Sequence, residues 1–161
     1  MLLKRSAPDT LIRLGEQSIE EILREVSGVE FIMLCSTDGF ELASIHKKNV
    51  ANSGKLAAVS SSILAMVQAF LGEINLNGCQ SITLDAENGK AILSAVPSPH
   101  HPMLIVAMTS KDVLLGHLLL AIKKASEKIA QADQPNGQLL DIKSPTRAFL
   151  FFQISGIKKA P

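Results

Sequence analysis

The chain has 161 residues, and its 16 Lys and Arg residues against 15 Asp and Glu residues give a net charge of only +1. This balance argues against a general binder of nucleic acid or membrane surfaces, because both partners require a basic excess. Hydrophobic residues make up 47% of the chain and charged residues 19%, which excludes disorder over most of its length. The composition has one oddity, a crowding of Phe residues near the C-terminus: Phe149, Phe151 and Phe152.

Neither the N-terminus nor the cysteines indicate export from the cell. The basic start of the chain is followed by Ser6-Ala7-Pro8-Asp9, where a signal peptide would need an apolar run. Cys35 and Cys79 lie far apart without a CxxC spacing, so we expect buried, reduced thiols. Residues 56–72 approach the length of a membrane span, but their serines and glutamine suit a buried helix better. We therefore expect a soluble, cytoplasmic protein.

The first elements in chain order are a helix and a hairpin. Apolar residues recur at helical spacing after Asp9, a suitable N-cap, and Gly28 offers the left-handed position that ends a helix. Residues 29–36 are apolar at both parities, which predicts an interior strand buried on both faces. A turn at Thr37-Asp38-Gly39-Phe40 leads into a second strand at about residues 40–45.

Residues 52–74 predict a helix with one broad apolar face and an opposite face without charges. One face carries large side chains, which we expect to pack on the core: Leu56, Val59, Ile63, Met66, Val67, Phe70 and Ile74. The other face is small and uncharged, so that another helix can approach closely. That second helix belongs either to the same domain or, as we favour, to a second copy in a homodimer. The predicted dimer interface comprises Ala58, Ser61, Ser62, Ala65, Gln68, Ala69 and Gly72.

The next part of the chain predicts three strands and a helix. Residues 79–86 and 91–96 flank an Asn-Gly turn and form a second predicted hairpin, and residues 103–109 form a further strand. Asp112 is predicted to cap the last helix, whose inward residues begin at Leu114.

The order of these elements is helix, two strands, helix, three strands, helix, which predicts an α+β domain. We expect three layers: a five-stranded antiparallel sheet with the central helix on one face and the N- and C-terminal helices on the other. The Gln134-Pro135-Asn136-Gly137 segment predicts a linker. It divides the chain into a domain at residues 9–132 and a linker with an apolar, basic C-terminal tail at residues 133–161.

Residues that could carry out catalysis are few and scattered. The adjacent pair His100-His101 lies between prolines in a predicted surface loop, and we assign no metal site to it. The run Ser60-Ser61-Ser62 lacks a GxSxG elbow and a partner base, so these serines are better explained as small packing residues. The sequence contains no GxxxxGK[ST] loop for nucleotide phosphates. We predict a protein that is not an enzyme and needs no cofactor.

Several short segments resemble the roadblock/dynein light chain family when they are taken in order. Leu23-Arg24-Glu25-Val26-Ser27-Gly28-Val29 is similar to the end of the family's first helix, and Asp38-Gly39-Phe40-Glu41-Leu42-Ala43-Ser44 is similar to its hairpin. Leu104-Ile105-Val106 and Asp112-Val113-Leu114-Leu115-Gly116 resemble its last strand and the start of its last helix. The resemblance covers about residues 11–131, and Ser27 stands where the family usually has Pro.

The resemblance implies a roadblock- or longin-like, profilin-like fold and a homodimer with paired central helices and sheets joined at an edge strand. It also implies a regulator or scaffold of a Ras-like small GTPase, which docks across the helix pair. Lys55 and Glu73, the ionised residues of the central helix, are the charges best placed to steer that docking. No arginine lies on or beside this helix, so we do not expect it to supply an arginine finger.

Two alternatives remain open at this stage. A small-molecule sensor of the profilin, PAS or GAF type would need a pocket between sheet and helix lined by polar groups, whereas the inner positions read as packed core. The Phe-rich tail could cover an apolar groove of its own domain, bind a partner as a strand or helix, or contact a membrane. Of these three roles, membrane contact is the one that we favour least.

Overall fold

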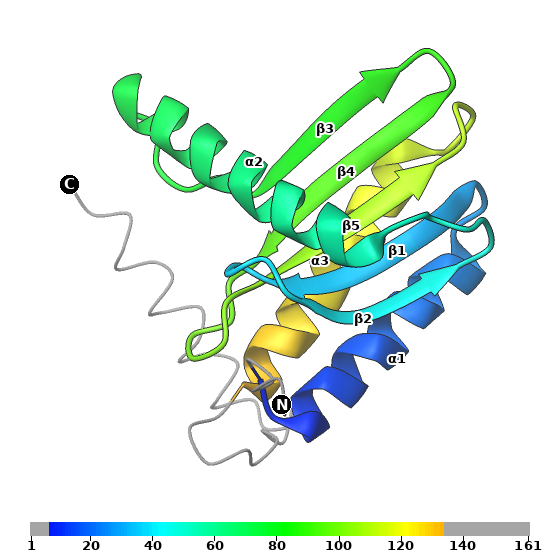
Figure 1. The fold of residues 1–161 in the computed structure, drawn as a ribbon, viewed down its shortest axis with the longest axis horizontal. Coiled ribbons are helices and arrows are strands. Elements are labelled where there is room, and N and C mark those ends of the chain that lie inside the picture. Colours follow the sequence, from blue (N-terminus) through cyan, green and yellow to red (C-terminus); the bar gives the residue numbers. More distant parts are fainter. Residues whose placement is uncertain (1–6, 134–161) are drawn as a thin grey trace.

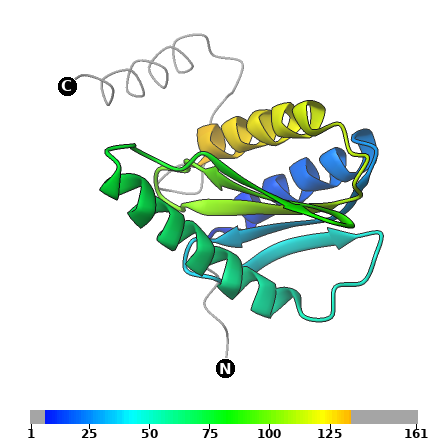
Figure 2. The ribbon, with the colours of Figure 1, turned by 90° about the horizontal axis from the view of Figure 1, so that it is seen from above.

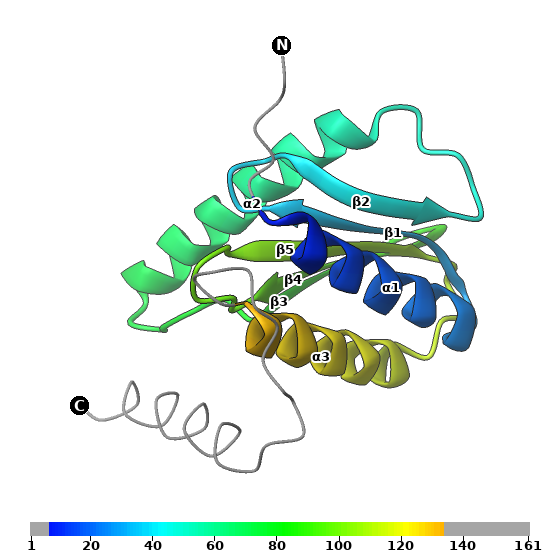
Figure 3. The same ribbon diagram turned by 90° about the horizontal axis from the view of Figure 1, so that it is seen from below.

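The structure, a computed structural model, describes residues 7–133. The elements follow one another as shown in Figure 1: α1 (Asp9–Glu25), β1 (Val29–Ser36), β2 (Glu41–His46), α2 (Ser53–Glu73), β3 (Ser81–Ala86), β4 (Gly89–Val96), β5 (Met103–Thr109) and α3 (Leu115–Ala132). The strands form one antiparallel sheet in the order β2-β1-β5-β4-β3. α2 lies on one face of this sheet, while α1 and α3 lie together on the other (Figures 2 and 3). The α+β, three-layer fold expected from the sequence is therefore confirmed.

α1 and α3 close one face of the sheet over an apolar core. Ile19 of α1 and Ile129 of α3 are both fully buried in this core. α1 approaches β1 so closely that a Cβ atom added at Gly15 would overlap the end of the Leu34 side chain, which would have to shift. A glycine at this position therefore favours the close approach of helix and sheet.

β1 sends alternate side chains to the two layers, as its apolar sequence predicted. Ile32 and Leu34 belong to the core under α1 and α3, whereas Phe31 and Met33 belong to the core under α2. All four side chains are fully buried. The predicted turn after β1 is also present, with Gly39 at a φ of +93°, a backbone conformation that favours glycine.

Two helix starts differ from the sequence-based expectation. α1 begins at Asp9 itself, with Pro8 in the N-cap position. α3 begins at Leu115, after Asp112, and Leu114 is 71% exposed instead of inward. Apolar periodicity could not place the start of α3. Leu114 precedes the helix, so the helical repeat does not determine the direction of its side chain. The tail at residues 134–161 lies outside the described residues.

Candidate functional site

The N-terminal half of α2 is fixed firmly to the sheet. Oδ1 of Asn52 accepts a hydrogen bond of 2.9 Å from the backbone N–H of Lys55 and so caps the helix. Ala57, Ser60 and Leu64 are its buried residues. They pack over β1 and its neighbours, where Phe31, Met33, Leu104 and Val106 form the apolar floor.

The prediction of which face of α2 meets the core was wrong for several large residues. Val59 is 45% exposed, Met66 is 68% exposed, Phe70 is 64% exposed and Ile74 is 50% exposed, whereas the small Ala57 is fully buried. The strands already supply bulky side chains on this face, so the helix can come close only through small residues. The sequence could not show this, because α2 is apolar on all sides and periodicity selects no face.

The residues predicted for a dimer interface occupy mainly the outer side of α2. One of them, Ser61, is half-buried, and its hydroxyl donates a hydrogen bond to the carbonyl oxygen of Thr37 in the β1–β2 turn. The others are exposed: Ala58, Ser62, Ala65, Gln68, Ala69 and Gly72. Lys55 and Glu73 are also exposed, near the two ends of the helix.

The C-terminal half of α2 extends past the edge of the sheet. Figures 1 and 2 show the helix crossing the strands and continuing beyond β3. Burial agrees with this view, because Leu64 is the last buried residue of the helix. Among the described residues, no other element covers the outer side of this half.

β3 is an edge strand with an exposed apolar residue on the α2 side. Ile82 packs partly under α2, and Leu84, two residues further and therefore on the same face, is 44% exposed. Within residues 7–133, β3 pairs with β4 alone, and no other described strand lies along its outer edge. We call the following exposed apolar residues the α2–β3 surface: Val59, Met66, Phe70, Ile74, Leu76 and Leu84.

α2 is long and apolar enough, by length and composition, to cross a membrane. The largely buried helix expected from the sequence is not found among the described residues. Ala57, Ser60 and Leu64 pack on the sheet, whereas 17% of the apolar 18-residue window is buried and most of its side chains are exposed or half-buried.

The described residues offer little for catalysis or metal binding. No group of three or more His, Cys, Asp or Glu side chains within residues 7–133 is arranged to hold a metal ion. Burial, reinforced by the nearby charge of Glu41, raises the pKa of the Cys35 thiol to about 12. Burial also raises the pKa of Cys79. Both thiols therefore stay protonated at neutral pH, as poor nucleophiles.

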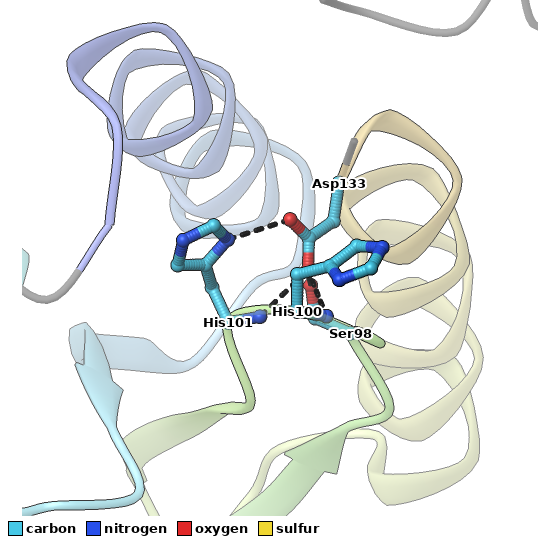
Figure 4. A network of polar contacts seen from close by, with 4 residues as sticks. All are labelled: Ser98, His100, His101 and Asp133. Atoms are coloured by element: carbon cyan, nitrogen blue, oxygen red, sulfur yellow. Dashed lines mark hydrogen bonds and ion pairs between the residues drawn. The ribbon is translucent and has the colours of Figure 1, made fainter. Parts of the chain in front are cut away.

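Asp133 is a buried carboxylate that holds together the β4–β5 loop and the end of α3 (Figure 4). Its Oδ2 accepts hydrogen bonds from the Ser98 hydroxyl and, at 2.8 Å each, from the backbone N–H groups of His100 and His101. Nδ1 of His101 lies 2.7 Å from Oδ1. Burial raises the pKa of Asp133, but these hydrogen bonds outweigh it and hold that pKa below its ordinary value. The sequence predicts Asp133 as part of the linker, and its only signal is an acidic residue directly after a helix.

A cleft of about 370 Å³ lies between α1 and α3, on the opposite face of the sheet from α2. Its walls include charged side chains of both signs, such as Glu21 and Lys124. The sensor alternative requires a pocket between the sheet and a helix, lined by polar groups. Under α2, the fully buried side chains of Phe31, Met33 and Leu104 belong to a packed apolar core.

Comparisons with known proteins agree with this architecture. Residues 17–106 match the model of the Roadblock/LC7 domain. The uncharacterized protein MJ0714 of Methanocaldococcus jannaschii is 26% identical over 117 residues, which cover 71% of this chain and 95% of that protein.

Two solved structures are similar in fold. The gliding protein MglB from Thermus thermophilus superposes with a TM-score of 0.68 at 21% identity, over 77% of this chain and 91% of that one. MglB from Myxococcus xanthus superposes with a TM-score of 0.63 at 16% identity, over 76% of this chain and 93% of that one. Because the family model matches more than half of the chain, and these structures share its fold, this chain belongs to the Roadblock/LC7 domain family.

Proposed function

We propose that this chain is a homodimeric interaction module that regulates or scaffolds a Ras-like small GTPase, without catalysis of its own and in the cytoplasm. Membership of the Roadblock/LC7 family supports the GTPase-related role. The observation that carries the homodimer is the α2–β3 surface, which leaves several large apolar side chains in water beside an open strand edge. Such a surface on a folded domain is typical of a protein interface.

The arrangement that best covers this surface joins two copies at β3. Edge-to-edge pairing of β3 with β3 of the second copy would satisfy the open backbone groups and extend the sheet. The C-terminal half of α2, which extends past β3, would then lie over the sheet of the second copy. Each copy thus supplies the helix that the other copy lacks above Leu84.

Large residues carry most of the contact area in this arrangement. Val59, Met66 and Phe70 lie on the side of α2 that faces away from the β1–β2 turn, since Ser61 and Ala58 contact that turn. We place the centre of the helix seam on these large side chains. The small residues predicted from the sequence, such as Ala65 and Ala69, flank it.

The GTPase docks across the outer side of the paired helices, where Lys55 and Glu73 are exposed. α2 carries no arginine, and Arg13 and Arg24 lie on α1, across the sheet from α2. A finger residue from the helix platform therefore does not act in hydrolysis. The module influences hydrolysis by biasing the switch loops of the GTPase itself.

The experiment has two steps. Sedimentation equilibrium of the full chain should give a dimer at micromolar concentration, and a strict monomer at all concentrations would contradict the homodimer. Titration with a Ras-like GTPase from the same organism, in each nucleotide state, should then give saturable binding. At a protein concentration at which sedimentation shows the variant to be dimeric, Lys55→Ala should bind the GTPase more weakly, while binding of unchanged strength would remove Lys55 from the docking site.

A further inference from the structure

The charges of α2 are arranged with a symmetry that the proposed dimer can use. Among its residues only Lys55 and Glu73 are ionisable. They are 18 residues apart, about five helical turns, so they lie on the same side of the helix and about 27 Å from each other. Both are exposed, and neither forms an ion pair with another of the residues that the structure describes.

The midpoint between these charges is the last fully buried residue of α2. Leu64 is equally distant in sequence from Lys55 and Glu73, and after it only Val67 and Leu71 pack partly against the core under the helix. The half of the helix that follows extends past β3 (Figures 1 and 2). A two-fold axis between paired β3 edges would therefore pass close to the middle of α2. In that position, the two helices run antiparallel and overlap along their whole length.

We propose that Lys55 of each copy forms an ion pair with Glu73 of the second copy, and that these two pairs fix the antiparallel orientation and register of the α2 helices. This inference rests on the proposed homodimer. Two helices in parallel would instead place Lys55 beside Lys55 and Glu73 beside Glu73, which is unfavourable. The partner selected is a second copy of this chain, because its own helix carries opposite charges at the matching spacing.

These pairs act on specificity more than on affinity. Both residues are exposed at the rim of the seam, where a single ion pair stabilises little, and the apolar side chains of Met66 and Phe70 supply the main contact area. Symmetry doubles the effect, because one substitution changes both pairs in the dimer. A charge reversal also replaces each attraction by a repulsion, which makes the effect measurable.

The test is a charge-reversal cycle on the full chain, with the dimer dissociation constant measured by sedimentation. Lys55→Glu and Glu73→Lys should each weaken the dimer by about fivefold or more. The double variant K55E/E73K should return to within about twofold of the original constant. Lys123→Glu, an exposed charge reversal on α3 across the sheet, is the matched control and should leave the constant unchanged. The defect of each single variant should shrink as salt is raised.

The outcomes separate this inference from the homodimer itself. A monomeric unsubstituted chain overturns the homodimer, and the charge pairs with it. A dimer that responds to Lys55→Glu no more than to Lys123→Glu overturns the charge pairs alone. The charge pairs are also overturned if the single variants weaken the dimer and the double variant K55E/E73K weakens it as well. A parallel dimer predicts no change in the single variants, since like charges already face each other in it.

Discussion

On one face of the sheet, α1 and α3 lie side by side over a closed core that contains Ile19, Ile122 and Ile129. On the other face, α2 covers the strands fully only with its first half, Val67 and Leu71 of its second half pack partly against the core, and its large side chains at Met66 and Phe70 are more than 60% exposed. The first face holds the fold together within one chain. The second face is the one that we propose for association, so apolar side chains would serve folding on one side of the sheet and binding on the other.

The sharpest way to test this contrast is to remove comparable apolar side chains from the two faces. Ile19→Ala should lower the free energy of unfolding by about 3 kcal/mol, because a fully buried side chain leaves a cavity. Met66→Ala should change the unfolding of the isolated monomer by less than about 0.5 kcal/mol, since Met66 is exposed there. Urea unfolding at low protein concentration measures both, and equal losses would abolish the distinction between the faces.

The second prediction locates the helix seam. Phe70→Glu should weaken the dimer by about 100-fold, equivalent to about 2.7 kcal/mol, because it places a charge in the apolar centre of the contact. Ala65→Glu, on the small-residue side of the same helix, should have a smaller effect. Sedimentation of the two variants distinguishes the sides, and a larger effect at Ala65 would move the seam back to the small residues predicted from the sequence.

The third prediction concerns the polar anchor beside the closed face. Asp133→Ala should lower the free energy of unfolding by about 2 kcal/mol, because Ser98 and two backbone N–H groups lose their buried acceptor. The pKa of Asp133 is lower in the folded state than its ordinary value of 3.8. Its contribution is therefore complete above that ordinary value and is lost as the pH falls through the lower, folded-state pKa.

Chemical unfolding measured between pH 7 and pH 3 tests this assignment. The original chain should lose stability toward the acid end more steeply than Asp133→Asn, which has no carboxylate to protonate. Parallel curves for the two proteins would show that Asp133 does not carry the acid dependence.

The smallest predicted effect lies at the sheet edge. Leu84→Ala should weaken the dimer about threefold to fivefold, since Leu84 is covered only when a second copy is present. Its effect on monomer unfolding should be slight. Unchanged dimerisation would show that the helix of the second copy does not reach over β3.

Periodicity and turn residues were sufficient to predict the layers of this fold. The apolar run from Val29 to Ser36 indicated an interior strand, and Gly39 marked the turn that follows it. These signals are local, since each depends on a few neighbouring residues. The side of α2 that meets the sheet is not a local property. It depends on Phe31 and Met33 already filling the space, which is why Ala57 is buried and Met66 is exposed.

The Asp133 anchor could not be predicted for a related reason. His101 and Asp133 are 32 residues apart, and no periodic pattern connects a loop to the end of a distant helix. The interface of α2 with another helix, which the uncharged, five-turn length of α2 favours, stays a prediction. The sequence alone suggests only a GTPase-docking role for Lys55 and Glu73, because the path of α2 past the strand edge is visible only in three dimensions.

The overhang of α2 has a consequence for helix formation itself. Short helical segments are only marginally stable in water without tertiary contacts, and after Leu64 only Val67 and Leu71 pack partly against the core. If the proposed dimer dissociates, we expect this segment to fray, so that its backbone amides exchange with solvent faster than those before Leu64. Association would then include a coil-to-helix step, and the dissociation constant would depend on the fraction of free chains in which the last turns of α2 are already helical.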